Sequence, residues 1–166
     1  MNKTVDELLA EAAIRDVQIR YCRAVDRMDF DLLRTCFHAD ATADYGFFKG
    51  GVEEFIAMAR GGLTAYTSTT HFTGNQLVEV HGDSAWAEHY TVATHRCPAD
   101  ATGPVRDLVT TVRYVDRMER RDGDWRIAQR LLILDWWRTD PVTEIGSAPQ
   151  VQLGKRDGVD ASYSLR

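Results

Sequence analysis

The sequence predicts a single α+β domain in which N-terminal helices pack on one face of a strongly bent antiparallel sheet. Hydrophobic residues recur at helical spacing in the first third of the chain, and an alternation with period two follows from Ser68 to Arg138. Helices followed by a run of strands are typical of this class. The 166 residues, 44% of them hydrophobic, suffice for one core and leave little room for a second. A sheet that curves around helices favours an internal apolar pocket.

Three helices are expected before the strands. Acidic residues from Asp6 onward suit the first turn of a long helix, since carboxylates are favourable at that end of the helix dipole. Asp29 can cap a short second helix by accepting a backbone hydrogen bond. A brief strand is expected over Ala41–Tyr45, and the Gly50-Gly51 pair precedes a third helix.

The rest of the domain is expected to be strands joined by tight turns. The four expected strands are Ser68–Val80, Ser84–Arg96, Asp107–Arg120 and Asp124–Arg138. Asp122-Gly123 is a strong hairpin signal, and Gly82 marks another turn. Beyond the last strand, glycine, proline and scattered charges predict an arm or tail over residues 141–166, so the single domain is placed at residues 1–140.

The composition excludes several classes of protein. Lys and Arg total 20 against 25 Asp and Glu, and this net charge of −5 gives no basic surface for nucleic acid or an anionic membrane. No apolar stretch is long enough to span a bilayer, and the charged residues after Met1 do not resemble a signal peptide. Three cysteines without CxxC spacing favour a reducing, cytoplasmic setting, with Cys22 and Cys36 as small buried residues.

Asp26 and His71 are the first candidates for chemistry. Asp26 stands near the end of the long helix, where the helix dipole disfavours a carboxylate unless a partner compensates it. His71 stands at the start of a strand. If it points inward and meets Asp26, the pair forms a general base whose tautomer the carboxylate fixes. The alternatives are a solvated or capping Asp26 and a structural His71.

Two tyrosines and an arginine can complete such a site. Tyr21 and Tyr45 can donate to a carbonyl or hold a leaving hydroxyl, although a core role with a bonded hydroxyl is the alternative for each. Arg130 lies in an apolar strand and needs a partner or solvent. It can face the pocket and pair with Asp26 or an anionic substrate group, or it can lie on the solvent side. The sequence leaves both open.

No cofactor or metal is expected. His89 and His95 share one face of a strand, so a second histidine can line the pocket, but no metal-ligand spacing surrounds His71. Phosphate-binding glycine loops, a nucleophile elbow and a basic, aromatic platform for nucleic acid are all absent from the sequence.

Five short motifs in this order resemble the SnoaL-like branch of the NTF2-like superfamily. They are Tyr21-Cys-Arg-Ala-Val-Asp26, Leu33-x-x-x-Phe37-x-x-Asp40-Ala41, Phe48-Lys49-Gly50, His71-Phe-Thr-Gly-Asn75 and Arg121-Asp-Gly-Asp-Trp125-Arg-Ile127. The resemblance covers about Val5 to Pro141. It implies a cone of three helices cradled by a bent sheet with a deep apolar pocket, no cofactor, and a homo-oligomer, with a trimer favoured and a dimer as the alternative.

Within that superfamily the sequence looks most like members that eliminate with an Asp–His dyad, among them the bile acid 7α-dehydratases, scytalone dehydratases and hexachlorocyclohexane dehydrochlorinases. Asp26 and His71 match the dyad positions. Tyr21 and Tyr45 look like the tyrosines of the bile acid enzymes, whereas the dehydrochlorinases have a lysine at the position of Tyr21. Arg130 is similar in placement to a pocket arginine of the dehydrochlorinases. The same fold hosts other functions, so the resemblance does not fix the reaction.

The leading hypothesis is therefore a cofactor-independent lyase. It would be a dehydratase that acts on a hydrophobic, polycyclic hydroxy-carbonyl substrate of steroid or polyketide type, with His71 as general base and Asp26 in support. A ketosteroid-type isomerase would use the same residues without a leaving group. A non-catalytic ligand-binding protein or small subunit of an oxygenase is the alternative from another class.

Overall fold

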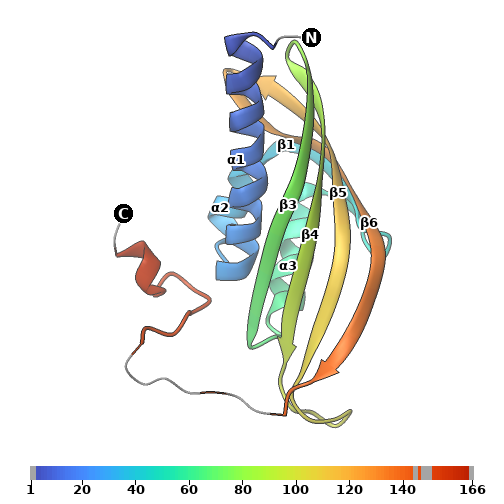
Figure 1. The fold of residues 1–166 in the computed structure, drawn as a ribbon, viewed down its shortest axis with the longest axis vertical. Helices are drawn as coiled ribbons and strands as arrows, with labels where there is room; N and C mark the ends of the chain where they lie inside the picture. The colour runs from blue at the N-terminus through green and yellow to red at the C-terminus, as the bar shows by residue number, and fades with distance from the viewer. Residues whose placement is uncertain (1–2, 144–145, 147–150, 165–166) are drawn as a thin grey trace.

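Three helices lie on the concave side of a curved six-stranded sheet (Figure 1). The computed structural model describes residues 3–143, 146 and 151–164. The helices are α1 (Val5–Arg27), α2 (Phe30–Thr35) and α3 (Val52–Leu63), and a single-turn helix η1 (Ala161–Tyr163) follows near the C-terminus. The strands are β1 (Phe37–Asp44), β2 (Lys49–Gly51), β3 (Ser68–His81), β4 (Ser84–Cys97), β5 (Arg106–Arg121) and β6 (Asp124–Pro141). The predicted α+β fold is confirmed.

Local sequence explains where α1 begins and ends. Thr4 and Glu7 form a capping box, with the Glu7 backbone N–H donating to Thr4 Oγ1 at 3.2 Å and the Thr4 N–H donating to Glu7 Oε2 at 2.7 Å. Met28 adopts a left-handed conformation with φ of 52° and ends the helix. Asp29 then caps α2 by accepting from Leu32 N at 3.0 Å, as the sequence predicted.

The sheet has the order β2-β1-β6-β5-β4-β3. Its pairings are antiparallel except for β1 and β6, which run parallel. The parallel pair was not expected, and neither was the three-residue strand β2. Strand β1 also begins at Phe37 rather than at Ala41, because Phe37 pairs with Ile127 of β6 and this tertiary pairing outweighs the helical spacing of the local sequence.

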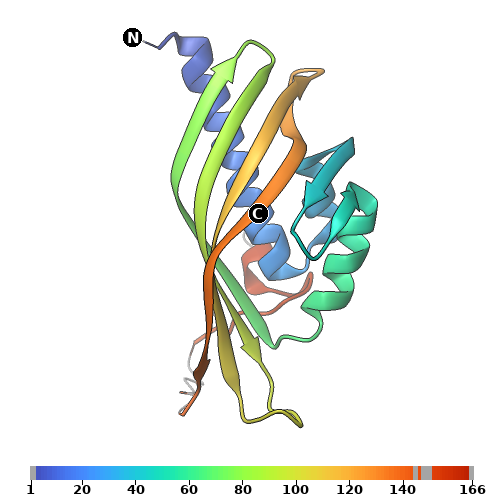
Figure 2. The same ribbon diagram turned by 90° about the vertical axis from the view of Figure 1, so that its right-hand side faces the viewer.

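Bulges and tight turns give the sheet its curvature. The pairing register shifts between Gly74 and Leu77 in β3, and twice more between β5 and β6, and such bulges bend a strand and increase its twist. Figure 2 shows the resulting bend. The Asp122-Gly123 turn joins β5 to β6 with φ of 54° and 89°, the conformation that an Asp-Gly hairpin favours.

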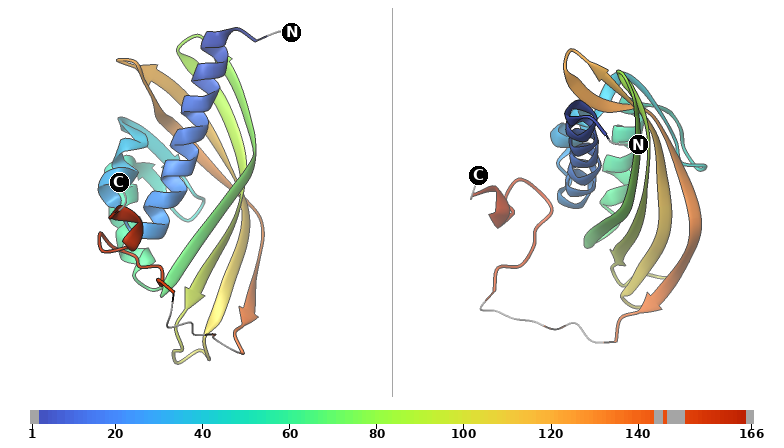
Figure 3. Two further views of the ribbon diagram at one scale, coloured as in Figure 1. Left: turned by 60° about the vertical axis from the view of Figure 1, so that its left-hand side comes forward. Right: turned by 45° about the horizontal axis from the view of Figure 1, so that its top comes forward.

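The core lies between the helices and the concave face of the sheet, and the right-hand view of Figure 3 shows these two layers facing each other. The largest fully buried apolar side chains are Ile14, Leu33, Met118 and Ile127. None of the described helices is long and apolar enough to cross a membrane.

The C-terminal part of the chain returns to the helices. After β6, residues 151–164 lie beside the C-terminal end of α1 (Figures 1 and 3). Of the arm that the sequence predicted over residues 141–166, residues 144–145, 147–150 and 165–166 lie outside the described residues.

Candidate active site

A cavity of about 670 Å³ lies between the helices and the concave face of the sheet. Most of its wall is apolar and includes Val25, Phe55, Met58, Val112, Leu132 and Trp137. The polar side chains in the wall include Tyr21, Tyr45, Tyr66, His71, His95 and Tyr114. A largely apolar cavity with a few converging polar groups is the usual form of a small-molecule site.

Asp26 and His71 meet at one end of this cavity. His71 Nδ1 lies 2.7 Å from Asp26 Oδ1, and the side chains are only 6% and 11% exposed, respectively. The His71 ring lines the cavity, whereas Asp26 lies outside its wall. With Nδ1–H donating to the carboxylate, the other ring nitrogen, Nε2, is free to accept a proton.

Strand β3 holds Asp26 in place with further hydrogen bonds. Thr69 Oγ1 donates to Asp26 Oδ1 at 2.9 Å, and the His71 backbone N–H donates to Oδ2 at 2.9 Å. These donors offset the unfavourable position of a buried carboxylate at the negative end of the α1 dipole. Thr69 and His71 are two residues apart on one strand, so both face α1.

His95 is a second histidine in the cavity wall. Its ring centroid lies 5.3 Å from that of His71 and the rings are nearly perpendicular, at 85°. Burial, with a smaller contribution from His71, lowers the pKa of His95 to about 4. The ring is therefore neutral at pH 7. Its Nδ1 is buried and has no hydrogen-bond partner among the described residues.

Three tyrosines pack against one another in the cavity wall. The Tyr21 and Tyr45 hydroxyls are 2.7 Å apart, and the Tyr114 ring packs against both in edge-on geometry. Tyr45 directly follows strand β1, and its ring stacks on that of Phe55 in α3 with the ring centroids 4.8 Å apart. Burial raises the pKa of Tyr21 and of Tyr45 well above the ordinary value. Both phenols stay protonated at neutral pH, so this pair can donate a hydrogen bond to a carbonyl or enolate oxygen.

Arg130 is placed differently from either alternative that the sequence left open. It is fully buried and binds Asp116 of β5 with two hydrogen bonds of 2.7 Å, and it neither pairs with Asp26 nor faces solvent. Its guanidinium lies 4.1 Å and 4.4 Å from the ring centroids of Tyr21 and Tyr114. Arg130 is not among the residues that line the cavity, whereas both tyrosines are, so it can act on a bound molecule only through them.

Arg130 keeps its charge in this buried position. Burial disfavours the charged guanidinium, but the Asp116 carboxylate outweighs this effect and raises the pKa of Arg130. Neither alternative for Arg130 included this partner, because Asp116 is its direct cross-strand neighbour and that relation depends on the register of β5 and β6.

The two buried cysteines are poor candidates for chemistry. Burial raises the pKa of Cys22 to about 12 and that of Cys36 to about 11, so neither forms a thiolate at neutral pH. Among the described residues, no group of three or more His, Cys, Asp or Glu side chains could hold a metal ion.

His89 lies behind the cavity wall rather than in it. Its ring stacks on that of Tyr114 with the ring centroids 5.1 Å apart, and a 2.5 Å hydrogen bond joins its Nδ1 to Thr73 Oγ1. Burial, and to a lesser degree the charge of Arg130, lowers the pKa of His89 to about 3. His89 is thus a buried neutral residue of the core.

This burial predicts acid-sensitive stability. Between an unfolded-state pKa near 6.5 and the folded value of about 3, the unfolded chain binds a proton at His89 that the folded chain does not. Above pH 6.5, the titration of His89 does not reduce the free energy of unfolding. Below pH 6.5, it should reduce the free energy of unfolding by about 1.4 kcal/mol per pH unit, as urea titrations at several pH values would measure.

His89→Gln tests this assignment. The variant should show a shallower loss of unfolding free energy between pH 6.5 and pH 5 than the unchanged protein. His81→Gln is the matched control, because His81 is exposed at the β3–β4 turn and should leave the slope unchanged. Equal slopes for all three proteins would contradict the assignment.

Sequence reasoning did not identify some residues of the site. Tyr114 and Thr69 stand in segments that alternate as ordinary strands, and nothing in their neighbours marks them. His95 was noted as sharing a strand face with His89, but the shared parity does not show which one reaches the cavity. The curvature of the sheet determines which histidine reaches the cavity. His95 lies in the cavity wall, whereas His89 stacks behind Tyr114.

The profile of the SnoaL-like domain matches residues 6–131, most of the chain. The chain belongs to the SnoaL-like domain family. None of the curated proteins compared with it gives a match.

Solved structures similar to this SnoaL-like chain show the shared fold. A hexachlorocyclohexane dehydrochlorinase, LinA type 2, has a TM-score of 0.75 at 18% identity, over 89% of this chain and 99% of that one. A protein from Novosphingobium aromaticivorans assigned as a scytalone dehydratase has a TM-score of 0.72 at 21% identity, over 87% and 96%. Rv3472(D26N) from Mycobacterium tuberculosis, of unknown function, has a TM-score of 0.65 at 27% identity, over 77% of each chain.

Proposed function

We propose that this SnoaL-like protein is a cofactor-independent lyase, a dehydratase that eliminates water from a hydrophobic, polycyclic hydroxy-carbonyl substrate. The observation that carries the proposal is the 2.7 Å contact between His71 Nδ1 and Asp26 Oδ1, with the His71 ring in the cavity wall. Two similar structures bear the names of eliminating enzymes, a dehydrochlorinase and a dehydratase, which supports the reaction class.

His71 would act as the general base. Its Nε2 takes a proton from the carbon next to the substrate carbonyl, and the electrons of the broken C–H bond form an enolate. Asp26 fixes the tautomer and stabilises the imidazolium that results. A positioned base of this kind contributes about 10²–10⁴-fold to the rate.

The tyrosine pair would stabilise the enolate. A hydrogen bond from Tyr21 or Tyr45 to the enolate oxygen lowers the energy of the charge that develops there. Arg130, stacked on the Tyr21 ring, strengthens the donor without touching the substrate. As the enolate collapses, the C–O bond to the β-hydroxyl breaks, and the proton held by His71 leaves with hydroxide as water.

The cavity supports a neutral, apolar substrate. Among the described residues that line it there is no Asp, Glu, Lys or Arg. An anionic or cationic substrate would leave its charge without a partner in an apolar wall, which is costly. About 670 Å³ is within the range of sites that bury a molecule the size of a steroid or a polyketide.

A panel of hydroxysteroids and polyketide-like hydroxyketones tests the proposal. Elimination from one of them should create a conjugated enone, seen as new ultraviolet absorbance together with a mass lower by one water. New absorbance without a change in mass would indicate the isomerase alternative on the same residues. No turnover of any member, by a protein that binds several of them, would favour the non-catalytic alternative.

A homo-oligomer, with a trimer preferred to a dimer, and a cytoplasmic location remain part of the proposal. On the outer face of the sheet, three exposed apolar side chains lie in one cross-strand row that Thr111 of β5 interrupts: Phe72 is 75% exposed, Val92 44% and Trp136 45%. Exposed apolar side chains gathered on one face support self-association.

A further inference from the structure

The cavity opens to solvent beside the second half of β6. Strand β1 pairs with β6 no further than Leu131, so among the described residues the stretch 132–137 has a neighbouring strand on one side only. The side chains of this stretch that line the cavity become more exposed along the strand, from partly buried Leu132 to Leu134 at 50% and Trp137 at 61%. The cavity therefore reaches the surface at Trp137, and this opening is its mouth.

Phe47 lies at the same mouth, on the loop between β1 and β2. Strands β1 and β6 run parallel and their last pair is Asp44 with Leu131, so Phe47 and Leu134 each follow that pair by three residues. Phe47 lines the cavity but is 79% exposed, and its ring packs edge-on against Tyr45 with the ring centroids 6.1 Å apart. Tyr45 is buried, so the two rings lead from the interior of the cavity to its mouth.

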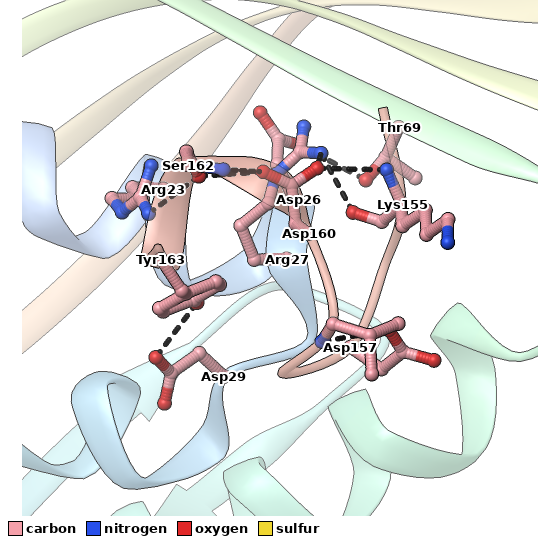
Figure 4. Close-up of polar contacts among 11 residues, drawn as sticks. Arg23, Asp26, Arg27, Asp29, Thr69, Lys155, Asp157, Asp160, Ser162 and Tyr163 are labelled. Carbon is pink, nitrogen blue, oxygen red and sulfur yellow. Dashed lines mark hydrogen bonds and ion pairs between the residues drawn. The ribbon is translucent and has the colours of Figure 1, made fainter. Parts of the chain in front are cut away.

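The C-terminal segment, residues 151–164, lies beside α1, on the side of the molecule away from β6 (Figures 1 and 3). Asp160 fastens it to the last turn of α1 by accepting from Arg27 Nη1 at 3.2 Å (Figure 4). Tyr163 Oη donates to Asp29 Oδ2 at 2.9 Å just beyond the helix. The segment therefore covers the end of the helix that carries Asp26.

Arg156 joins this segment to the connection between α3 and β3. Its Nη1 donates to the carbonyl oxygens of Leu63 at 2.9 Å and Tyr66 at 2.6 Å, and both residues line the cavity. The segment thus bridges α1 and the end of α3 on the side of the cavity where Asp26 and His71 meet. This leaves the mouth beside β6 as the route to His71.

The distance from the tyrosines to the mouth sets the length of a molecule that fills the cavity. Leu132 pairs with Tyr114, whose ring packs against those of Tyr21 and Tyr45. Trp137 stands five residues further along β6, and five residues of a strand span roughly 16 Å. A molecule that reaches from the tyrosines to Trp137 is therefore elongated, as a tetracyclic ring system with an alkyl side chain is.

The mouth favours an uncharged distal group. Its three exposed side chains are apolar, and the cations that stand nearest to them in the sequence are paired. Arg138 forms an ion pair with Asp140, and Lys49 forms one with Asp44. Exposed apolar side chains gain free energy when apolar surface covers them, whereas a carboxylate or phosphate at this place would compete with the carboxylates that already bind these cations.

We infer that Phe47, Leu134 and Trp137 form a distal subsite, which binds the apolar end of an elongated hydroxyketone whose reacting carbonyl lies at the tyrosine pair. The inference rests on the proposed function and narrows its substrate class to uncharged molecules that react at one end and extend to the mouth. The three residues determine specificity by binding and take no part in proton transfer.

Calorimetric titration of the full chain with three ketones tests the distal subsite. The ligands are a bicyclic ketone, a tetracyclic ketosteroid with an alkyl side chain, and the same steroid with a carboxylate at the end of that chain. The unchanged protein should bind the apolar steroid about 100-fold more tightly than the bicyclic ketone and about tenfold more tightly than the carboxylate.

Variants of the mouth show which side chains give this preference. Trp137→Ala and Phe47→Ala should each reduce the ratio of the affinities for the apolar steroid and the bicyclic ketone about tenfold. Trp137→Phe keeps a ring and should retain most of the ratio. Leu9→Ala is the matched control, because Leu9 is 63% exposed on α1 and does not line the cavity, so the ratio should stay unchanged. Circular dichroism confirms that each variant is folded.

An unchanged affinity ratio in both alanine variants would overturn the inference, as would tighter binding of the carboxylate or no binding of any of the three ketones. An equal loss of affinity for the short and the long ketone would also overturn it, because that result indicates a disturbed cavity. In each case, loss of turnover in His71→Gln would leave the proposed function standing. Full turnover in His71→Gln, with a ratio that still depends on Trp137, would remove the proposed base and leave the distal subsite.

Discussion

Replacing His71 with glutamine is expected to lower kcat about 10³-fold while the protein stays folded. The proposed general base contributes a factor of this order, and glutamine cannot accept a proton at neutral pH. The glutamine amide can still donate to Asp26 in place of His71 Nδ1, so the carboxylate keeps a partner and the cavity keeps its shape. Binding of a hydroxysteroid should change by less than about threefold, because the apolar wall that surrounds the substrate is intact.

The comparison needs a histidine that is not in the cavity. His81→Gln alters an exposed residue of the β3–β4 turn and should leave kcat unchanged. Asp26→Asn should also lower kcat, since an amide in place of the carboxylate can stabilise the wrong tautomer of His71. Full activity of His71→Gln would end the assignment of His71 as the base.

Replacing Asp116 with asparagine is expected to be the most destabilising single change. Both side chains of the Arg130–Asp116 pair are completely buried, and the substitution leaves the guanidinium charge without its carboxylate partner. Loss of one partner of a buried ion pair costs about 3–5 kcal/mol, which in a domain of this size corresponds to a melting temperature lower by roughly 10 °C. Thermal unfolding followed by circular dichroism measures the change.

An exposed ion pair gives the matched control. Asp124→Asn removes the partner of Arg126 on the surface, where both side chains are more than a third exposed, and should change stability by less than about 1 kcal/mol. A double variant, Arg130→Met with Asp116→Leu, removes both buried charges and should recover most of the lost stability. Equal melting temperatures for Asp116→Asn and the control would contradict this role of the pair.

The elements that local chemistry specifies were predictable. Asp29 caps α2 and Asp122-Gly123 forms the β5–β6 turn, because each acts on its own backbone within a few residues. Strand β1 was predicted too short, since Phe37 owes its strand conformation to pairing with Ile127, ninety residues away in sequence. Local periodicity carries no information about such a partner.

The site likewise has residues that the sequence could predict and residues that depend on tertiary structure. Residue types and helix position were enough to suggest Asp26 and His71 as a pair, and the structure joins them through a hydrogen bond, while their catalytic role remains a proposal. The partner of Arg130 depends on strand register, and the place of His95 depends on the curvature of the sheet. Arg156 lies in a C-terminal segment whose sequence has no helical or strand periodicity. The hydrogen bond from its side chain to the carbonyl oxygen of Leu63, at the end of α3, could therefore not be predicted from the sequence.

Hydrogen–deuterium exchange into a bound ketone tests the central claim most directly, because it detects proton abstraction even where no group leaves. A hydrophobic cyclic ketone that binds the protein is incubated in D₂O and analysed by mass spectrometry. The unchanged protein should place deuterium on the carbon next to the carbonyl, and His71→Gln should reduce the rate about 10³-fold, close to that in buffer. Equal exchange with both proteins, or none above the buffer rate with any ketone that binds, would contradict a base at His71.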